Sequence, residues 1–349
     1  MSPLDDYFSM NGSGIQAISI NVLDTGITST VYLSQCLSEC LRKVISIQKN
    51  RYSILQKPPC RNRETVRNNE YFQMPKQLSP AQVEQFWNDG FLFPVDAFDG
   101  VQARRYRSLL EEAERDHPGE IHAEHRNNAH YILKFLDEIA HHPVILDVME
   151  DLLGPDVLLT GTVLFIKEPQ TPAFVSWHQD STYTGIDPKE GITVWVALSE
   201  ASSESGCMQM IPGSHHQGIL EHHDRFGENN ILTRGQTIEG IEKERAVDVT
   251  LKPGQISLHH VRTVHSSTPN RSDDRRIGLA LQSFIAASVK QTLGEDYALS
   301  VRGQDPFQHF LRARRPQSDY EPEGIAFREA ANQRLSDILY HGSELKRDY

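Results

Sequence analysis

The sequence has little cysteine, no long hydrophobic run and no excess of basic residues. Its 349 residues include four cysteines (Cys36, Cys40, Cys60 and Cys207), too few and too unevenly spaced for a disulfide framework. No apolar run approaches the roughly 20 residues that a membrane-spanning helix needs. The acidic segment MSPLDDYF at the start is unlike a secretory signal. We therefore expect a protein of the reducing cytoplasm that does not span a membrane.

The charge balance argues against two classes of partner. The chain carries 35 Lys and Arg against 47 Asp and Glu, a net charge of -12. Nucleic acids and anionic membranes attract basic surfaces, so we expect neither as a partner. The acidity does not identify a substrate, and no pattern indicates an oligomeric state. Apolar residues make up 38% of the chain, which is enough for an ordinary globular core.

Residues 1–75 differ in character from the rest. A weak apolar pattern covers residues 15–35, and residues 32–48 have the spacing of a short helix. Residues 49–67 (KNRYSILQKPPCRNRETVR) are basic and contain a Pro-Pro pair, which is typical of a solvated linker. A nucleic-acid-binding arm is the alternative, which the net charge disfavours. We expect this extension to be poorly structured or loosely packed and not catalytic, with residues 76–349 forming the main domain.

Helices are expected before and after a β-rich region. Ser79 is suited to cap a helix, with proline at the first helical position and Gln82 three residues after the cap, and Gly90 is suited to end it. Helical spacing of apolar residues recurs over 101–116 and over 322–340, and a helix is also bounded by Pro143 and Gly154. The expected buried side of the last helix comprises Ile325, Phe327, Ala331, Leu335 and Ile338.

The region between about residues 157 and 287 has the pattern of a β-sheet protein. Short segments rich in β-branched and aromatic residues alternate with turns of Gly, Pro and Ser. The expected strands cover residues 157–166, 193–198, 207–211, 256–260 and 277–285. This spacing favours a sandwich or jelly roll. We therefore expect a mainly β fold with flanking helices that cover one sheet.

Two histidines and a carboxylate suggest a site for non-haem Fe(II). His178 and Asp180 are two residues apart, so both side chains point the same way on a strand. His265 is the expected third ligand, and His259 or His260 is the alternative. Two imidazoles and one carboxylate hold Fe(II) while leaving positions open for a co-substrate and O2. The other histidine pairs are interpreted as turn or surface residues: His141/His142, His215/His216 and His222/His223.

Arg276 follows His265 by eleven residues and opens the strand expected at 277–285. A guanidinium can grip a carboxylate with two parallel hydrogen bonds, which an anionic co-substrate beside the metal requires. One face of this strand carries Arg276 with small or polar residues and is suited to a cavity: Gly278, Ala280 and Gln282. The neighbouring Arg275 is expected to cap the charged loop 271–274, which is also the alternative role for Arg276.

Two further residues are candidates for the co-substrate pocket. Ser267 lies two residues after His265, so on a strand it points the same way and can donate to the same carboxylate. Trp195 shares a strand face with Thr193 and Ala197. It either forms a wall of the pocket or belongs to the core.

These residues lie in segments that resemble the phytanoyl-CoA dioxygenase family of Fe(II)/2-oxoglutarate oxygenases. The resemblance covers residues 76–345, and its combined motif is highly specific although each piece alone is not. The matching segments are FIKEP (165–169), WHQDSTY (177–183), VWVALSEASSESGCMQMIPGSH (194–215) and PGQISLHHVRTVHSSTPNRSDDRRIGLALQSFI (253–285).

The resemblance implies a double-stranded β-helix, a cupin-like jelly roll, with Fe(II), 2-oxoglutarate and O2 as cofactor and co-substrates. It implies that the iron ligands are His178, Asp180 and His265, and that Arg276 binds 2-oxoglutarate. Supporting contacts to 2-oxoglutarate are expected from Trp195, Ser267, a residue near Thr162 or Leu164, and His130.

The implied reaction is hydroxylation of an unactivated C–H bond of a small molecule, with release of succinate and CO2. Halogenases of this family lack the carboxylate ligand, so Asp180 favours a hydroxylase. The alternatives are a zinc or manganese hydrolase or isomerase on the same barrel, or a non-catalytic jelly-roll binding module. The sequence does not identify the substrate, and loop 216–245 is expected to form a solvated lid.

Overall fold

The computed structural model describes residues 76–122, 126–225, 227–232 and 234–343, together with three short strands nearer the N-terminus. The chain divides into two units, Met1–Tyr71 and Phe72–Tyr349. This division falls close to the boundary expected at residue 75. None of the helices in the described part of the chain has both the length and the apolar character needed to cross a bilayer.

The N-terminal unit contains an antiparallel sheet of three strands, β1 (Ser9–Met10), β2 (Gln16–Asn21) and β3 (Thr28–Leu33). The helix expected over 32–48 is wrong at residues 32–33, which belong to β3. The rest of that segment, with Cys36, Cys40 and Cys60, lies outside the described residues. That this extension is loosely packed and not catalytic stays a prediction.

The expected helices are present in the second unit. Ser79 and Gln82 form the capping box of the first, and Gly90 ends it in the left-handed conformation, at φ 83°. The α-helices are α2 (Pro80–Asp89), α3 (Gly100–Asp116), α4 (Lys134–Ala140), α5 (Pro143–Leu153) and α6 (Pro322–Leu339). Only α4 was not anticipated. In α6, Arg328 is buried against Glu120, a polar contact that the apolar spacing did not predict.

Two facing sheets form the body of this unit. The large sheet has the order β18-β17-β5-β15-β8-β13-β4, and the small sheet has the order β12-β9-β14-β6. The large-sheet strands are β4 (Phe91–Asp96), β5 (Val157–Lys167), β8 (Ile192–Ala197), β13 (Gln255–His260), β15 (Arg276–Ala286), β17 (Tyr297–Arg302) and β18 (Leu311–Arg312). The small-sheet strands are β6 (Val175–His178), β9 (Met208–Met210), β12 (Val247–Val249) and β14 (His265–Ser267).

Shorter elements connect these strands. Two further pairs of strands are β7 (Ile186–Asp187) with β16 (Lys290–Gln291), and β10 (His223–Asp224) with β11 (Gln236–Thr237). The single-turn helices are η1 (Ala129–Tyr131), η2 (Asp180–Thr182), η3 (Ser214–Gln217) and η4 (Lys243–Arg245). The prediction of a mainly β jelly roll with flanking helices is confirmed.

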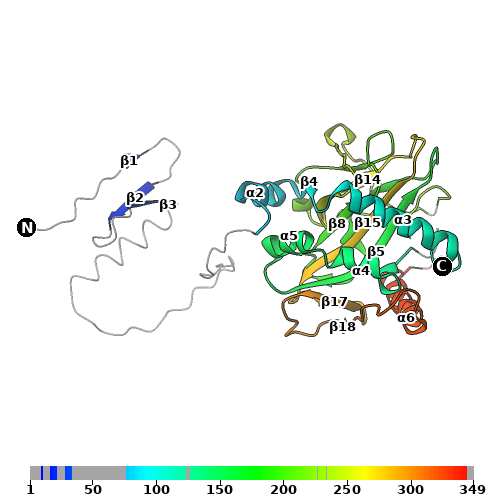
Figure 1. Ribbon diagram of the computed structural model, residues 1–349. Helices are drawn as coiled ribbons and strands as arrows, with labels where there is room; N and C mark the ends of the chain where they lie inside the picture. The colour runs from blue at the N-terminus through cyan, green and yellow to red at the C-terminus, as the bar shows by residue number, and fades with distance from the viewer. Residues whose placement is uncertain are drawn as a thin grey trace, which may run out of the picture. The chain divides into compact units, whose positions relative to one another are not determined.

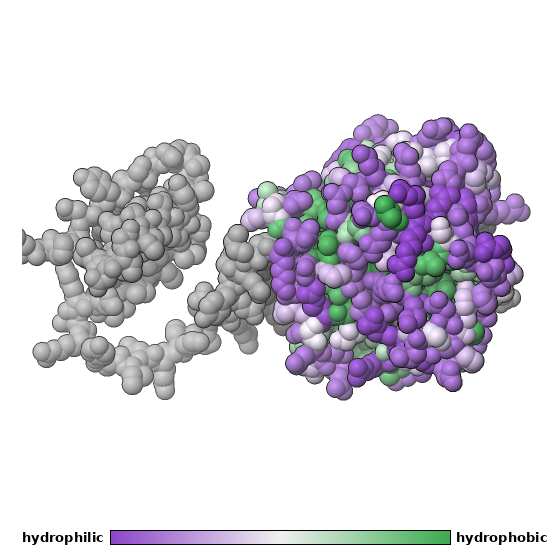
Figure 2. Space-filling view, viewed as in Figure 1, coloured by the Kyte–Doolittle hydropathy of each residue, from purple (hydrophilic) through white to green (hydrophobic). Residues whose placement is uncertain are grey.

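The main hydrophobic core lies between the helices and the outer face of the large sheet. Figure 1 shows α3, α4 and α5 in front of this sheet. Phe86 of α2, Leu110 of α3 and Ile145 of α5 are completely buried there, against strand residues such as Leu279. The solvent side of the helical layer is mostly hydrophilic, with small separate hydrophobic patches (Figure 2). The helices therefore seal one face of the large sheet, and its other face is left for the site.

Candidate metal and co-substrate site

Three side chains from two strands and a turn converge between the sheets. His265 on β14 pairs directly with His178 on β6 across the small sheet. Asp180 lies two residues beyond His178, the last residue of β6. Gln179 between these two residues is extended (φ -122°, ψ 135°), so the strand alternation still brings both side chains to one side. Nε2 of His178 is 3.4 Å and Nε2 of His265 is 3.6 Å from Oδ1 of Asp180. These three residues form a group with metal-ligand spacing, all within 4.8 Å of one another.

Backbone carbonyls orient both imidazoles. Nδ1 of His178 lies 2.9 Å from the carbonyl of Ser176, and Nδ1 of His265 lies 3.0 Å from the carbonyl of Thr263. A carbonyl only accepts, so each Nδ1 carries the proton and each Nε2 presents its lone pair to the centre of the group. Metal-binding histidines are held in this way in proteins. The donor set therefore fits a divalent transition metal.

The second carboxylate oxygen of Asp180 is held by groups outside the triad. Thr193 donates to Oδ2 at 2.7 Å, and Nε2 of His259 lies 3.0 Å from the same oxygen. Oδ1 is therefore the oxygen directed at the two histidines. His259 is thus a partner of Asp180, and His260 pairs with Glu190 at 2.8 Å instead. This geometry favours His265 over both alternatives.

The protonation states also suit a metal. Burial and the nearby His178 hold the pKa of His265 well below its ordinary value, so this imidazole is neutral. Burial opposes ionisation of Asp180, but the imidazoles of His265, His178 and His259 outweigh burial when they carry protons, and they then hold the pKa of this carboxyl well below its usual range. Neutral imidazoles and an ionised carboxylate are the forms that bind Fe(II).

Arg276 is buried beside the triad without an anion to bind. Its side chain is 1% exposed, and its Nε and one terminal nitrogen have no acceptor among the described residues. The guanidinium lies 5.2 Å from the ring centre of Trp195. Burial lowers its pKa to about 10, so it remains charged near neutral pH. Because a buried cation without a partner is costly, this arrangement indicates a site for an anion.

Trp195 contacts both the core and the pocket, so neither of its two expected roles excludes the other. Its indole packs among residues of the inter-sheet core and also lines the cavity beside Arg276. The ring fills the space over Gly278, where a Cβ atom would lie 1.8 Å from Cζ2 of Trp195. Gly278 was expected to open onto the cavity, and instead it makes room for the indole. The glycine therefore sets the position of the ring next to Arg276.

We expect Gly278→Ala to weaken both the fold and the co-substrate site. The added methyl group must displace the indole, and overpacking of this kind costs about 1–3 kcal/mol. Urea unfolding measures the first effect, and titration with 2-oxoglutarate measures the second. Gly119→Ala is the control, because a Cβ atom there meets nothing within 4 Å. Equal stability and equal affinity in the two variants would contradict this account.

A second buried cation, Lys167, was not recognised in the sequence. It lies directly opposite Arg276 in the register of the neighbouring strands β5 and β15, and its side chain is completely buried. Its ammonium group donates to Oγ of Ser267 at 2.7 Å and to the carbonyl of Thr268. Ser267 lines the cavity, and its own proton is free to point at a ligand because this oxygen accepts from Lys167. The Arg276 guanidinium and the Ser267 hydroxyl thus line the place expected for a carboxylate, and Lys167 holds Ser267 from behind.

Lys167 makes the stability of the ligand-free protein depend on pH. Burial, with the nearby charge of Arg276, lowers its pKa from 10.5 to about 6. Between these values the unfolded chain binds one more proton, so the free energy of unfolding rises with pH by up to about 1.4 kcal/mol per unit. Lys167→Met removes this contribution. Urea unfolding at about pH 7 and about pH 9 should therefore show a smaller increase in the variant, and equal increases would refute the prediction.

Thr162 and His130 contact each other, but on the wrong side of the sheet for a co-substrate role. Nδ1 of His130 lies 2.8 Å from Oγ1 of Thr162, and both are buried. On β5 the neighbours Gly161 and Val163 line the cavity, so alternation turns Thr162 toward the helices. Leu164 likewise packs in the helix-facing core, although it also borders the cavity. The expectation that Thr162 and His130 bind 2-oxoglutarate is therefore wrong.

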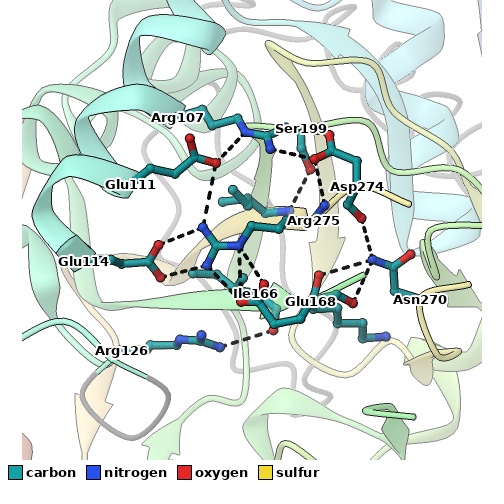
Figure 3. A network of polar contacts seen from close by, with 12 residues as sticks. Arg107, Glu111, Glu114, Arg126, Ile166, Glu168, Ser199, Asn270, Asp274 and Arg275 are labelled. Atoms are coloured by element: carbon teal, nitrogen blue, oxygen red, sulfur yellow. Dashed lines mark hydrogen bonds and ion pairs between the residues drawn. The ribbon is translucent and has the colours of Figure 1, made fainter. Parts of the chain in front are cut away.

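Arg275 does not cap the loop 271–274 as expected. Its guanidinium forms ion pairs with Glu114 of α3 at 2.8 Å and with Glu168 at 2.9 Å (Figure 3). The loop residue Asp274 is held instead by Arg107 at 2.6 Å. Arg275 thus ties α3 to the sheet on the side facing away from the cavity, while Arg276 faces inward.

The triad and Arg276 line one continuous cavity of about 530 Å³. Loop 216–245 covers part of it and is packed more closely than the expected solvated lid. Arg234 is 7% exposed, binds Asp224, and lies 3.7 Å from the ring centre of Tyr183. His215 was expected at a turn or on the surface, but it is buried, with Nε2 3.1 Å from the carbonyl of Trp87.

Comparison with known proteins places this site in a family. The phytanoyl-CoA dioxygenase (PhyH) family model matches residues 76–278, more than half of the chain. A probable alpha-ketoglutarate-dependent hypophosphite dioxygenase of Stutzerimonas stutzeri is 30% identical over 169 residues, which cover 48% of this chain and 58% of that protein. Phytanoyl-CoA dioxygenase domain-containing protein 1 of Danio rerio is 34% identical over 146 residues, which cover 40% of this chain and 48% of that protein. The chain thus spans about half the length of these curated relatives.

The fold is also similar to solved structures. The non-heme monooxygenase ThoJ has 35% sequence identity and a TM-score of 0.67, over 74% of this chain and 97% of that one. CytC3, at 24% identity and a TM-score of 0.55 over 70% of this chain and 96% of that one, shares the fold. The match to the family model ends at residue 278, and it covers all four strands of the small sheet and all three residues of the convergent group. The chain belongs to the phytanoyl-CoA dioxygenase family.

Proposed function

We propose that this protein is an Fe(II)- and 2-oxoglutarate-dependent dioxygenase that hydroxylates an unactivated C–H bond of a small molecule. One observation carries the proposal. A His-Asp-His group with its donor atoms turned inward lines the same cavity as a buried guanidinium that has unsatisfied N–H groups. A zinc or manganese hydrolase has no 2-oxoglutarate for the guanidinium to bind. A binding module does not need the complete His-Asp-His group.

The residues fit the groups they would hold. His178, Asp180 and His265 would bind the metal, since the imidazoles present Nε2 and the carboxylate presents Oδ1. Arg276 and Ser267 would bind the distal carboxylate of 2-oxoglutarate. When bound, the metal and co-substrate supply oxidation by O2, with conversion of 2-oxoglutarate to succinate and CO2.

The protein's own contribution is placement and exclusion of water. Thr193 and His259 fix Asp180 so that one oxygen is left for the metal. Trp195 and Gly278 give the pocket a rigid wall beside Arg276. The buried setting strengthens the pairing of Arg276 with a carboxylate, because little water competes for either partner.

Hydroxylation is favoured over halogenation by the carboxylate of Asp180, which occupies the position that halogenases of the family leave to chloride. The fold alone does not decide the reaction. Structures at 21% identity to this chain include a carbocyclase and an epimerase from nogalamycin biosynthesis. The mass of the product distinguishes these reactions. Hydroxylation adds one oxygen atom to the substrate, ring closure removes two hydrogen atoms, and epimerisation leaves the mass unchanged.

The proposal is tested by adding Fe(II) and 2-oxoglutarate to the full-length protein without oxygen. We expect a weak visible absorption band from the metal–co-substrate chelate, followed by slow succinate formation when air is admitted. Zn(II) with 2-oxoglutarate serves as the control and should give neither signal. Absence of both signals with Fe(II) would refute the proposed function.

A further inference from the structure

The cavity ends, away from the triad, at a buried carboxylate that has no cationic partner. Asp296 lines the cavity and is 8% exposed. Its carboxylate accepts a hydrogen bond from the N–H of Tyr297, and it forms no ion pair with the described residues. Burial raises its pKa to about 6, so it is still mostly ionised at neutral pH. An ionised carboxylate in such a place is costly unless a ligand supplies the missing positive charge.

The neighbouring arginines already have partners. Arg334 of α6 forms an ion pair with Glu295 at 3.0 Å. Arg234 on the lid binds Asp224 and donates to the carbonyl of Leu339 at 2.7 Å. Neither guanidinium forms an ion pair with Asp296, and although the charge of Arg334 acts on Asp296 from a distance, Glu295 balances that charge. This end of the cavity, which we call the outer chamber, therefore carries an unbalanced negative charge.

Apart from Arg234, whose charge is balanced by Asp224, the rest of the outer chamber is neutral. It is lined by short polar and aliphatic residues from β5, β15 and α6, namely Thr160, Gly161, Gln282, Ser283, Leu335 and Leu339. Arg126 also lines the cavity, but farther along β5, where it donates to the carbonyl of Ile166 (Figure 3). There its charge faces Glu114 and Glu168. An anionic group entering the outer chamber would thus meet Asp296, and the guanidinium of Arg234 there is already paired with Asp224.

The strand order sets the distance between Asp296 and the triad. Asp296 immediately precedes β17, which is three strands from β8 in the order β17-β5-β15-β8. Thr193 on β8 holds Asp180. Neighbouring strands are about 4.8 Å apart, so Asp296 lies about 14 Å along the sheet from Thr193. A ligand that reaches both ends must therefore be extended.

We propose that the outer chamber binds a positively charged nitrogen group through Asp296, and that the substrate is an extended cationic small molecule such as an amine. This inference rests on the proposed function, because it assigns the other end of the same ligand to the oxidation site. It disfavours free carboxylic acids and phosphorylated acyl carriers as substrates. Recognition by Asp296 would also fix which carbon reaches the metal, since the charge is anchored at one end.

The test uses full-length protein loaded with Fe(II) and 2-oxoglutarate under nitrogen. Three probes share one chain and differ only at the end: octylamine, octanol and octanoic acid. Calorimetry measures their affinities, and admission of air then measures succinate release. We expect the amine to bind roughly ten- to a hundredfold more tightly than the alcohol, the range for a buried charge-assisted hydrogen bond. The acid should bind most weakly.

Asp296→Asn keeps the shape of the side chain and removes its charge. It should abolish the preference for the amine and change octanol binding little. Glu329→Gln, an exposed residue of α6, is the control for loss of one negative charge and should behave like the wild type. The ranking of the three probes in the wild type decides the matter even if Asp296→Asn fails to fold.

The possible results separate this inference from the proposed function. Amine binding that is no tighter than alcohol binding, or that is unchanged in folded Asp296→Asn, overturns the inference, even if succinate forms. Amine binding that depends on Asp296 supports the inference. If amine binding depends on Asp296 but the Fe(II)–2-oxoglutarate absorption band and succinate formation are both absent, only the proposed function fails.

Discussion

Asp180→Gly should abolish substrate-dependent turnover and most of the affinity for Fe(II). The change removes the only carboxylate of the convergent group and leaves two imidazoles. Loss of an outer-shell partner costs about ten- to a hundredfold in metal affinity or activity. Loss of a metal ligand itself should reduce metal affinity and activity by more than this range. Metal content after dialysis and succinate formation with added Fe(II) measure the two effects.

Thr193→Val provides a graded comparison for Asp180→Gly. It removes the hydrogen bond to Oδ2 of Asp180 and keeps the shape and the carboxylate. We expect a loss of about ten- to a hundredfold in this variant, smaller than that of Asp180→Gly. Asp187→Asn, an exposed acid on β7, should resemble the wild type. Turnover of Asp180→Gly at the wild-type rate would refute the assignment of this ligand.

The sequence was sufficient for the parts of the site that depend on local spacing. His178 and Asp180 are two residues apart, and the extended Gln179 between them keeps the alternation that the prediction used. The helix start at Ser79 and its end at Gly90 follow from the chemistry of caps, which needs no partner elsewhere in the chain. Such features are decided within a few residues.

The wrong or missing predictions within the site depend on contacts between distant segments. The resemblance implies a co-substrate contact near Thr162 or Leu164, but it does not say which side of the strand faces the cavity. His259 was weighed as a ligand, yet its role follows from pairing of β13 with β8, which places it next to Thr193. Register between strands is set by the whole fold. The spacing in the sequence therefore favoured the three residues that the structure brings together, but it did not indicate that Thr193 and His259 support Asp180.

Buried charges were the hardest features to anticipate. Lys167 appears in the sequence as one polar residue in the segment FIKEP, and Asp296 follows another acid, Glu295. In the structure Glu295 is paired with Arg334 at the surface, whereas Asp296 is enclosed in the cavity. Charged residues are rarely fully buried, so the default reading of both is a solvated surface residue. Their burial without an opposite charge is what makes them informative about ligands.

Arg276→Met should have opposite effects on the ligand-free protein and on co-substrate binding. In the ligand-free protein the guanidinium is buried without an acceptor for two of its nitrogens, so its removal should raise the free energy of unfolding or leave it unchanged. Binding of 2-oxoglutarate should fall by more than about a hundredfold, since a buried charge-assisted pair is lost. Thermal unfolding with and without 2-oxoglutarate measures both effects, because a ligand that binds only the folded state raises the melting temperature.

Two arginine variants make this prediction specific. Arg276→Lys keeps the charge but not the two parallel hydrogen bonds, so the KM for 2-oxoglutarate should rise by about ten- to a hundredfold. Arg275→Met changes the adjacent residue, whose side chain faces away from the cavity and pairs with Glu114 and Glu168. It should lower stability and leave 2-oxoglutarate binding unchanged. If Arg275→Met weakened that binding as much as Arg276→Met, the effect would be one of strand stability, and Arg276 would lose its assigned role.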